Sequence, residues 1–239
     1  MKGLDILLSG GIPRGRTVLI EGPPGTGKTI LSLHFITKGI LLEKGKDEDK
    51  KAKTTSEPAV FVCIDESPKD LIREALAFGW NLEELIKLKQ LIIIDGYSGR
   101  VGLRSECKSG VSVGEKEPAK AILNLIQTIC ESNKIKRLVV DSVSALLDEL
   151  QGKPRREAVQ KLISILSGLS LTTLLTAEIG DADDLVERYA AHGVIRLAYE
   201  KEQRKINRTL QIVKMRETPH YMGIIPYRIR KMGMELDII

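Results

Sequence analysis

A glycine-rich loop between an apolar run and a helix-forming run constrains this chain more than any other feature. Residues 19–35 read LIEGPPGTGKTILSLHF, in which Gly22, Gly27, Lys28 and Thr29 satisfy the pattern G-x-x-x-x-G-K-[S/T]. In such a loop the main-chain N–H groups surround phosphate oxygens, the lysine reaches the β- and γ-phosphates, and the hydroxyl binds Mg²⁺. We therefore expect ATP and Mg²⁺ to bind here. The expected nucleotide contacts are Gly22, Pro23, Pro24, Gly25, Thr26, Gly27, Lys28, Thr29 and Ile30, with Thr29 as a metal ligand.

Apolar runs and helical periodicity alternate along the rest of the chain. The apolar runs are continuous, as expected for strands that are buried on both faces of a mostly parallel sheet. Between them, apolar residues recur with a spacing near 3.6, which predicts helices that cover the sheet. The alternation predicts an α/β doubly wound fold. We expect strands at 17–22, 59–65, 91–95, 137–141, 172–177 and 193–199, and helices at 27–43, 67–78, 118–132 and 154–169.

The C-terminal stretch 208–239 has a different pattern. It contains short β-like runs with turns at Gly223 and Gly233, and it lacks a helical repeat between them. This pattern predicts a short antiparallel appendage on the parallel sheet.

The length of 239 residues suits one α/β domain with insertions, so we expect a single domain over residues 1–239. The stretch 43–58 is nearly all charged and small polar residues, which predicts a flexible insertion. The stretch 96–118 is rich in glycine and serine, which predicts a mobile loop of a length that is often functional.

The composition excludes several classes of protein. A formal net charge of +5 permits nucleic acid or other anionic partners without requiring them. The three cysteines, Cys63, Cys107 and Cys130, lack metal-ligand spacing, and their odd number argues against a disulfide framework. The chain opens with no signal peptide and contains no run of 18 apolar residues. We therefore expect a cytoplasmic protein with no zinc site and no membrane insertion.

Carboxylates end two of the expected strands. The run RLVVD ends in Asp141, where a second Mg²⁺ ligand would stand, and at least two further strands separate it from Lys28. The stretch FVCIDESP places Asp65 and Glu66 at a strand end, where a carboxylate can orient water for in-line attack on a γ-phosphate. The same pair also fits the start of a helix capped by Ser67. We expect a catalytic role for the pair, and the sequence leaves open which member activates the water.

Five motifs occur in an order and with a spacing similar to the KaiC-like branch of the RecA superfamily of ATPases. They are GLDILLSGGIPRG, EGPPGTGKT, CIDESP, LVVDSVSAL and KMRETPH, and together they span nearly the whole chain. The resemblance implies a RecA-like P-loop core that assembles into rings, commonly hexamers, with ATP between subunits. It places the catalytic carboxylates on Asp65 and Glu66, the Mg²⁺-site carboxylate on Asp141 and a nucleotide-sensing polar residue on Glu178.

The resemblance also implies that Lys214 and Arg216 reach the γ-phosphate of a neighbouring subunit. The two residues are two apart on an expected strand, so their side chains leave the same face. The far end of the chain cannot easily fold back to its own phosphate loop, so we expect this pair to act in trans. The alternative is that Lys214 and Arg216 are solvated surface charges. Two residues depart from the family pattern: Glu217 follows the pair and could weaken its field, and His192 stands where an aspartate is usual.

Several functions remain open from the sequence. The first is a ring-forming ATPase whose hydrolysis drives a conformational change or regulates a protein partner. The alternatives are a recombinase paralogue that binds single- or double-stranded DNA in repair, a Ser/Thr kinase, and an ATP-sensing scaffold. Arg155 and Arg156 follow the Asp141 strand, where RecA-like proteins carry a DNA-facing loop, although they also fit a solvated helix start. Arg204 and Arg208 fit an exposed hairpin.

Overall fold

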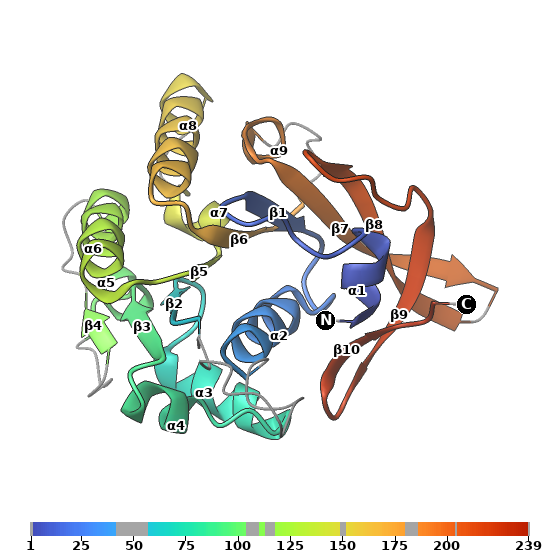
Figure 1. Cartoon of the computed structure of the whole chain (residues 1–239), viewed down its shortest axis with the longest axis horizontal. Coiled ribbons are helices and arrows are strands. Elements are labelled where there is room, and N and C mark those ends of the chain that lie inside the picture. The colour runs from blue at the N-terminus through green and yellow to red at the C-terminus, as the bar shows by residue number, and fades with distance from the viewer. Residues whose placement is uncertain are drawn as a thin grey trace, which may run out of the picture.

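The computed structural model describes residues 2–41, 57–103, 110–112, 118–148, 152–179, 186–203 and 205–238. In this part of the chain a single ten-stranded sheet runs in the order β10-β9-β8-β7-β1-β6-β5-β2-β3-β4, with helices on both faces (Figure 1). The strands are β1 (Thr17–Glu21), β2 (Ala59–Cys63), β3 (Leu91–Asp95), β4 (Gly110–Ser112), β5 (Arg137–Asp141), β6 (Thr172–Ala177), β7 (Gly193–Glu202), β8 (Lys205–Met215), β9 (Ile224–Arg230) and β10 (Gly233–Leu236).

The parallel half of the sheet extends from β7 to β4, and it forms because its strands are apolar on both sides. All five residues of β1 and of β2 are buried. The strands β1, β6, β5, β2 and β3 are therefore covered by a hydrophobic cluster on each face. All of the pairings within this half are parallel, which brings the carboxyl ends of the central strands to one edge.

The two faces are covered by different helices (Figure 1). One cluster joins apolar side chains of α1 to α4 to the sheet, and the other joins those of α6 to α8 to its opposite face. The helices are α1 (Lys2–Leu7), α2 (Lys28–Leu41), α3 (Pro68–Ala77), α4 (Leu82–Lys87), α5 (Tyr97–Arg100), α6 (Pro118–Asn133), α7 (Val143–Leu146), α8 (Gly152–Gly168) and α9 (Val186–Ala190). No helix in the described ranges combines the length and apolar character needed to cross a bilayer.

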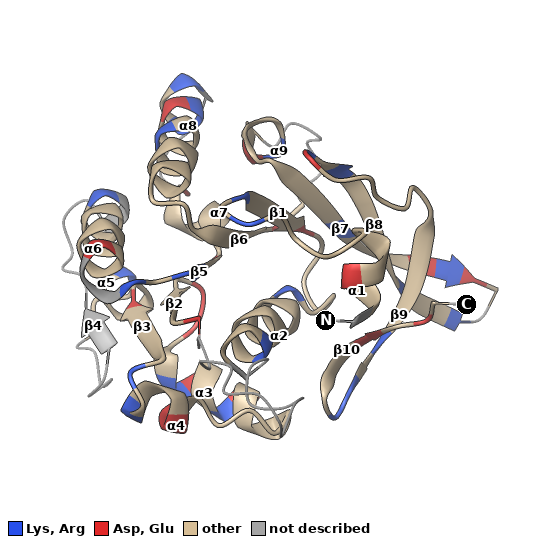
Figure 2. Ribbon diagram, viewed as in Figure 1, with Lys and Arg blue, Asp and Glu red and all other residues tan. Residues whose placement is uncertain are grey.

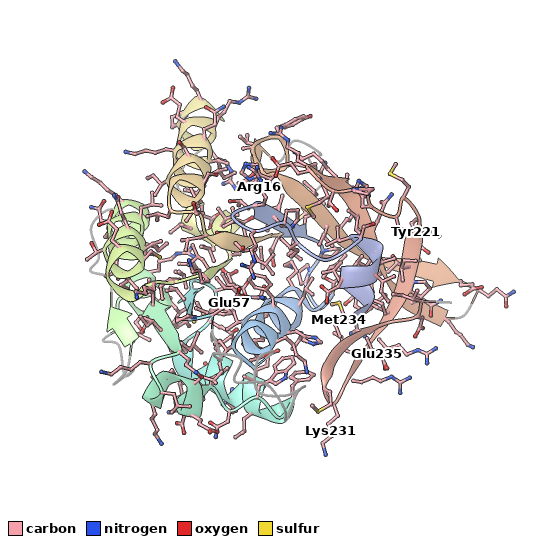
Figure 3. The ribbon with its side chains drawn as sticks, in the orientation of Figure 1. Arg16, Glu57, Tyr221, Lys231, Met234 and Glu235 are labelled. Atoms are coloured by element: carbon pink, nitrogen blue, oxygen red, sulfur yellow. The ribbon has the colours of Figure 1, made fainter. Side chains whose placement is uncertain are left out.

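The antiparallel wing consists of strands β7 to β10. Strand β7 pairs in parallel with β1 and antiparallel with β8, and β9 and β10 continue the same sheet. The wing curves over α2, where Met234 of β10 is buried in the core and lies beside this helix in Figure 3. The predicted fold class is confirmed: a mostly parallel sheet flanked by helices carries an antiparallel C-terminal part.

Each expected strand and helix is present, with ends that differ by a few residues. The prediction missed the short helices α1, α4, α5, α7 and α9, because elements of four to six residues are too short to display a helical repeat. The stretch 96–118, expected as one loop, contains α5 and β4. Most of the expected insertion 43–58 lies outside the described residues.

Candidate nucleotide site

The phosphate loop follows β1 directly, and α2 begins at Lys28. Gly25 has a φ of +78° and Gly27 a φ of +90°, in the region that glycine adopts without steric cost. At Gly22 a Cβ would lie 2.5 Å from the carbonyl oxygen of Leu197. These three glycines are therefore required by the backbone, and they leave the cradle open for an anion.

Lys28 lies inside the loop. Its Nζ donates to the carbonyl oxygens of Gly22 at 2.8 Å and Pro23 at 3.1 Å. Burial lowers the pKa of the Lys28 ammonium, and three nearby carboxylates oppose this shift, with Glu178 and then Asp141 the largest. The ammonium thus has acidic groups around it and carbonyls of the loop as partners, and it stands where a triphosphate would need a cation.

Asp141 ends β5 and its side chain is buried. Hydroxyl groups of Thr176 and Thr29 donate to its carboxylate. Burial raises the pKa of Asp141, while these two hydroxyls act in the opposite direction. A hydroxyl and a carboxylate that meet beside a phosphate loop suit Mg²⁺, which takes few protein ligands and completes its shell with phosphates and water. Accordingly, no three His, Cys, Asp or Glu side chains in the described part of the chain form a metal cluster on their own.

The predicted catalytic carboxylates lie next to Asp141. Backbone N–H groups of Ile64 and Asp65 donate to the Asp141 carbonyl oxygen, at 2.7 Å and 3.4 Å, which holds the loop after β2 against β5. Asp65 is exposed, whereas Glu66 is half-buried. Burial raises the pKa of Glu66 to about 8, with a further contribution from Glu74 and other carboxylates. Glu66 therefore holds its proton more strongly than an ordinary glutamate, as suits a general base near neutral pH.

The Ser67 cap is also present, because its hydroxyl accepts a hydrogen bond from the Asp70 N–H at 3.2 Å. The capping interpretation and the catalytic one are compatible, since the cap holds the start of α3 while the carboxylates precede it. The structure thus brings together six predicted site residues at the carboxyl edge of the sheet. They are Lys28, Thr29, Asp65, Glu66, Asp141 and Glu178.

Lys214 and Arg216 lie at the opposite edge of the sheet from this group. The register pairs Met215 with Gly193 of β7 and Gly193 with Val18, near the start of β1. The phosphate loop begins four residues later, which corresponds to about 13 Å along a strand. Lys214 Nζ donates to the carbonyl oxygens of Arg188 at 3.0 Å and of Tyr189 at 3.4 Å. The Arg216 side chain is exposed.

Glu217 and His192 have partners that the sequence did not reveal. The Glu217 carboxylate pairs with the guanidinium of Arg16, which precedes β1 and is labelled in Figure 3. Its charge is therefore directed to Arg16. The imidazole Nδ1 of His192 accepts the Thr17 N–H at 3.1 Å, so His192 holds the start of β1. Burial, and then Arg16 and Arg216, lower the pKa of His192.

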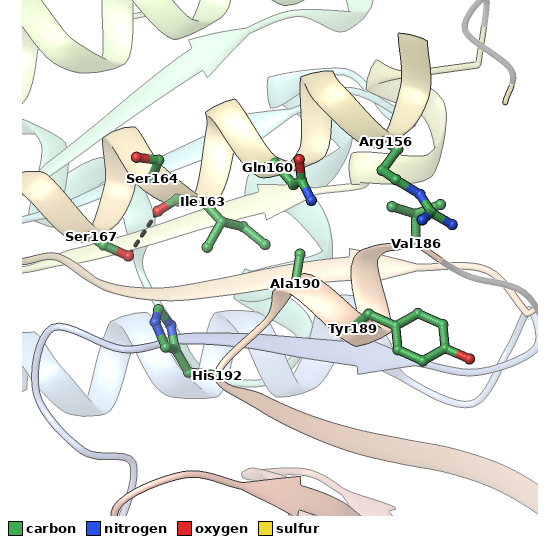
Figure 4. Close-up of a pocket in the computed structure, with 9 residues that line it drawn as sticks. All are labelled: Arg156, Gln160, Ile163, Ser164, Ser167, Val186, Tyr189, Ala190 and His192. Atoms are coloured by element: carbon green, nitrogen blue, oxygen red, sulfur yellow. Dashed lines mark hydrogen bonds between the residues drawn. The ribbon is translucent and has the colours of Figure 1, made fainter. Parts of the chain in front are cut away.

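The fold separates Arg155 from Arg156, for which the sequence left both a DNA-facing loop and a solvated helix start open. Arg155 donates to the buried Glu187 carboxylate at 2.6 Å and to the Leu147 carbonyl oxygen at 3.1 Å, so its guanidinium is paired within the chain and fits neither alternative. Arg156 is exposed and lines a cavity of about 640 Å³ between α8 and α9, with Tyr189 on the other side (Figure 4). Elsewhere, basic and acidic residues are interspersed along most elements (Figure 2).

Sequence reasoning missed Glu21 and its partners. Glu21 ends β1 immediately before the phosphate loop, and its side chain is fully buried. Its two carboxylate oxygens accept from Arg188 of α9 and Arg196 of β7, each at 2.8 Å. An acidic residue at the end of an otherwise apolar run was the available signal, because a buried carboxylate must be paired.

It also missed the contacts of the wing with the loop. Tyr199, Arg208 and Tyr227 all donate to carbonyl oxygens of the phosphate loop. The expectation that the C-terminal part cannot reach its own phosphate loop is therefore wrong for these residues, although it holds for Lys214 and Arg216. No local signal could have found the three contacts, because the partners are at least 175 positions away along the chain and meet the loop only through the sheet register.

Comparison with known proteins gives a consistent result. Residues 1–237 match the sequence model of the family described as "ATPase: KaiC". A UPF0273 protein of Methanopyrus kandleri is 34% identical, with 99% of this chain and 90% of that protein covered. The crystal structure of a KaiC-like protein from the hyperthermophilic archaeon Pyrococcus horikoshii superposes with a TM-score of 0.78 at 32% identity, covering 98% of this chain and 94% of the other.

The circadian clock oscillator protein KaiC of Nostoc is 34% identical over 99% of this chain. This chain covers 43% of the length of that relative. The likeness to the clock protein is therefore a likeness to less than half of it.

Proposed function

Because the chain belongs to the KaiC family of ATPases, we propose that it is a Mg²⁺-dependent ATPase that works as a homo-oligomeric ring, with a hexamer favoured. The observation that carries this proposal is the convergence of Lys28, Thr29, Glu66 and Asp141 at the end of β1, β2 and β5. The family is oligomeric, which supports the ring. In this proposal, hydrolysis drives a conformational change that a partner senses.

In this proposal each group has a separate role. The N–H groups of the loop and the Lys28 ammonium bind the β- and γ-phosphates. Thr29 and Asp141 would hold Mg²⁺, which when bound neutralises charge on the phosphate oxygens. Glu178, at the end of β6 and within electrostatic reach of Lys28, is positioned to respond to the charge of the nucleotide.

We assign the activation of water to Glu66 in preference to Asp65. The Glu66 carboxyl is half-buried and its pKa is raised to about 8, whereas the Asp65 side chain faces solvent. A carboxylate with such a raised pKa accepts a proton from an attacking water more readily than an ordinary glutamate does. Asp65 then contributes negative charge near Lys28.

Charge that develops on the γ-phosphate oxygens needs a cation from outside the chain's own site. Lys214 and Arg216 are too far from their own phosphate loop, and Arg216 is exposed at the other edge of the sheet. We propose that they act on the site of a neighbouring copy. An arginine supplied in this way accelerates phosphoryl transfer by about 10³ to 10⁵.

Two substitutions test the proposed activity. Lys28→Ala should abolish ATP binding measured by calorimetry, because the loop loses its cation, whereas Lys38→Ala on the same helix should bind normally. Glu66→Gln should keep ATP affinity but slow hydrolysis by about 10² to 10⁴, since an amide cannot accept the proton of the water. Glu83→Gln in α4 is the matched control. Retained ATP affinity in folded Lys28→Ala, or undiminished turnover in Glu66→Gln, would contradict the assignment.

A further inference from the structure

A row of three polar side chains crosses the antiparallel wing beside the phosphate loop. Tyr199 of β7 is the register partner of Arg208 of β8, and Arg208 is the register partner of Tyr227 of β9. Residues that stand directly opposite one another on neighbouring antiparallel strands project from the same face of the sheet. The Arg208 guanidinium carbon lies 5.8 Å from the centre of the Tyr199 ring. We call these three residues the cross-strand row.

The cross-strand row contacts three consecutive carbonyl oxygens of the phosphate loop in matching order. Tyr199 Oη donates to Pro24 at 3.4 Å, and Arg208 Nε donates to Gly25 at 3.3 Å. Tyr227 Oη donates to the carbonyl oxygen of Thr26. Strand order in the wing therefore maps onto residue order in the loop.

Side chains of the wing lie close to two glycines of the loop. A Cβ on Gly25 would lie 2.8 Å from Tyr199 Oη, and a Cβ on Gly27 would lie 2.7 Å from Ile229 Cδ1. Tyr227 is buried, so its hydroxyl is shielded from competing water. The contact between wing and loop is thus a fitted surface as well as a set of hydrogen bonds.

Peptide geometry shows what these contacts do to the phosphate side of the loop. In a planar trans peptide the C=O and N–H groups point in opposite directions. A donor on the carbonyl oxygens of Pro24, Gly25 and Thr26 therefore directs the N–H groups of the next residue in each case away from the wing. Proline has no N–H group, so Pro23 and Pro24 offer none. The residues whose N–H groups are oriented are Gly25, Thr26 and Gly27, the three that follow the two prolines, whereas the Gly22 N–H donates to the Ala177 carbonyl oxygen at 3.3 Å.

Each contact also strengthens the N–H group on the far side of its peptide. A hydrogen bond accepted by a carbonyl oxygen polarises the peptide, and its N–H group becomes a better donor. The guanidinium of Arg208 adds a full positive charge behind the loop. Burial raises the pKa of the Tyr227 hydroxyl, so Tyr227 remains a neutral donor.

We propose that Tyr199, Arg208 and Tyr227 are positioning residues that orient the phosphate-binding N–H groups of the loop from behind. This inference deepens the proposed function and rests on it, because it concerns how the same loop binds a triphosphate. The row touches the outer carbonyls and takes no part in activating water. Its loss should therefore weaken nucleotide binding and raise KM, while turnover at saturating ATP changes little.

The experiment removes the donors without removing the side chains' bulk. Tyr227→Phe should weaken ATP binding about tenfold, which corresponds to ~1.4 kcal/mol for one buried hydrogen bond. A triple variant with Tyr199→Phe and Arg208→Gln should weaken it by at least 30-fold, with kcat within about threefold of the original. Arg208→Lys should weaken binding less than Arg208→Gln does, because lysine keeps the positive charge but not the geometry of the Nε donor. A purely structural role would lower the melting temperature without this split between KM and kcat.

Tyr221→Phe and Arg228→Gln are the matched controls on the wing. Tyr221 lies at its outer margin (Figure 3), and Arg228 pairs with Asp237, away from the loop. Both should bind ATP as the unchanged protein does. If the triple variant binds ATP with unchanged affinity while Lys28→Ala does not bind, the positioning role is wrong and the proposed function stands.

Amide hydrogen exchange on the protein without added nucleotide tests the cross-strand row independently of the proposed ATPase activity. Tyr227→Phe should speed exchange of the amides of residues 25–28 at least fivefold, with the amides of β1 and β6 unchanged. This result supports the row even if the unchanged protein binds no ATP, an outcome that would overturn only the proposed function. Equal exchange of the loop amides in Tyr227→Phe, Tyr221→Phe and the unchanged protein would overturn the row.

Discussion

The two ends of strand β8 carry the same kind of side chain and meet different surroundings. At its beginning, Arg208 donates to Gly25 of its own phosphate loop. At its end, Lys214 donates to carbonyl oxygens of α9, and Arg216 extends into solvent just beyond the strand. Eight residues separate the two arginines, or about 27 Å in a fully extended strand.

The difference shows that register, not residue type, decides which basic residue can serve a site in its own chain. Because β8 runs antiparallel to β7, β8 begins beside the carboxyl ends of β7 and β1, where the phosphate loop lies. Its end lies at the edge where β1 starts. Arg208 is consequently a partner of the loop in cis, whereas Arg216 lies away from its own loop and, in the proposed function, acts on the nucleotide of another copy.

Side-chain contacts connect the two ends through α9. Glu21, which precedes the loop, is paired with Arg188, and the carbonyl oxygen of Arg188 accepts the Lys214 ammonium. A movement of the loop that displaced Glu21 would therefore also displace α9, whose carbonyl oxygens accept hydrogen bonds from Lys214. The following predictions test the two ends separately and then this connection.

The largest effect is expected at the far end. Arg216→Ala should leave ATP affinity largely intact and reduce turnover by about 10³ or more, or ~4 kcal/mol of transition-state stabilisation. The row variants should behave in the opposite way, with changed affinity and retained turnover. Steady-state kinetics and calorimetry on both sets measure the contrast.

Mixing decides whether the far end acts in trans. Arg216→Ala subunits and Glu66→Gln subunits should regain activity when combined, because some interfaces then pair an intact Glu66 with an intact Arg216. A mixture that stays inactive, together with full turnover by dilute monomer, would show that Lys214 and Arg216 are surface charges.

A smaller effect is expected on breaking the connection between the ends. Glu21→Gln should lower the free energy of unfolding by about 3 kcal/mol, because it leaves two arginines beside a buried amide in place of a carboxylate. Chemical denaturation measures the loss, and Glu200→Gln, an exposed acidic residue of β7, is the control. An unchanged free energy of unfolding would mean that the ion pairs of Glu21 contribute nothing net.

The smallest effect is expected in the pH dependence of stability, and it concerns Glu66 beside the phosphate loop. Burial and neighbouring carboxylates raise the pKa of Glu66 from 4.5 to about 8 in the folded protein. Between these values the folded state retains a proton that the unfolded chain releases, so stability falls as pH rises. Each unit of pKa difference corresponds to about 1.4 kcal/mol, which solvent around a half-buried group reduces.

The stability advantage of Glu66→Gln over the unchanged protein should therefore grow by about 1–2 kcal/mol as the pH rises from 5 to 8. Arg228→Gln on the wing should show no such trend, because arginine keeps its charge throughout this range and Arg228 pairs with Asp237 away from the site. Denaturant titrations at several pH values measure both. A stability difference that is constant with pH for Glu66→Gln would contradict the raised pKa.

The local features of the site could be predicted from the sequence. The pattern from Gly22 to Thr29 requires a particular turn between a strand and a helix, and an apolar run that ends in Asp141 or Asp65 places a carboxylate at a strand end. Parallel strands bring such ends to one edge, so the proximity of Lys28, Asp141 and Glu66 followed from the fold class. Short elements such as α9 could not be predicted, because five residues make little more than one turn and the apolar spacing cannot recur.

The sequence by itself determined the α/β core, the phosphate loop and the acidic residues beside it, because each depends on neighbours within a few turns or one strand. Only the tertiary structure decided that Arg155 is paired internally with Glu187, that Glu21 is held by Arg188 and Arg196, and that Arg208 supports the loop while Arg216 does not. These assignments depend on strand register and on pairs more than 30 positions apart. A shift of one residue in the register would turn each side chain to the opposite face of the sheet.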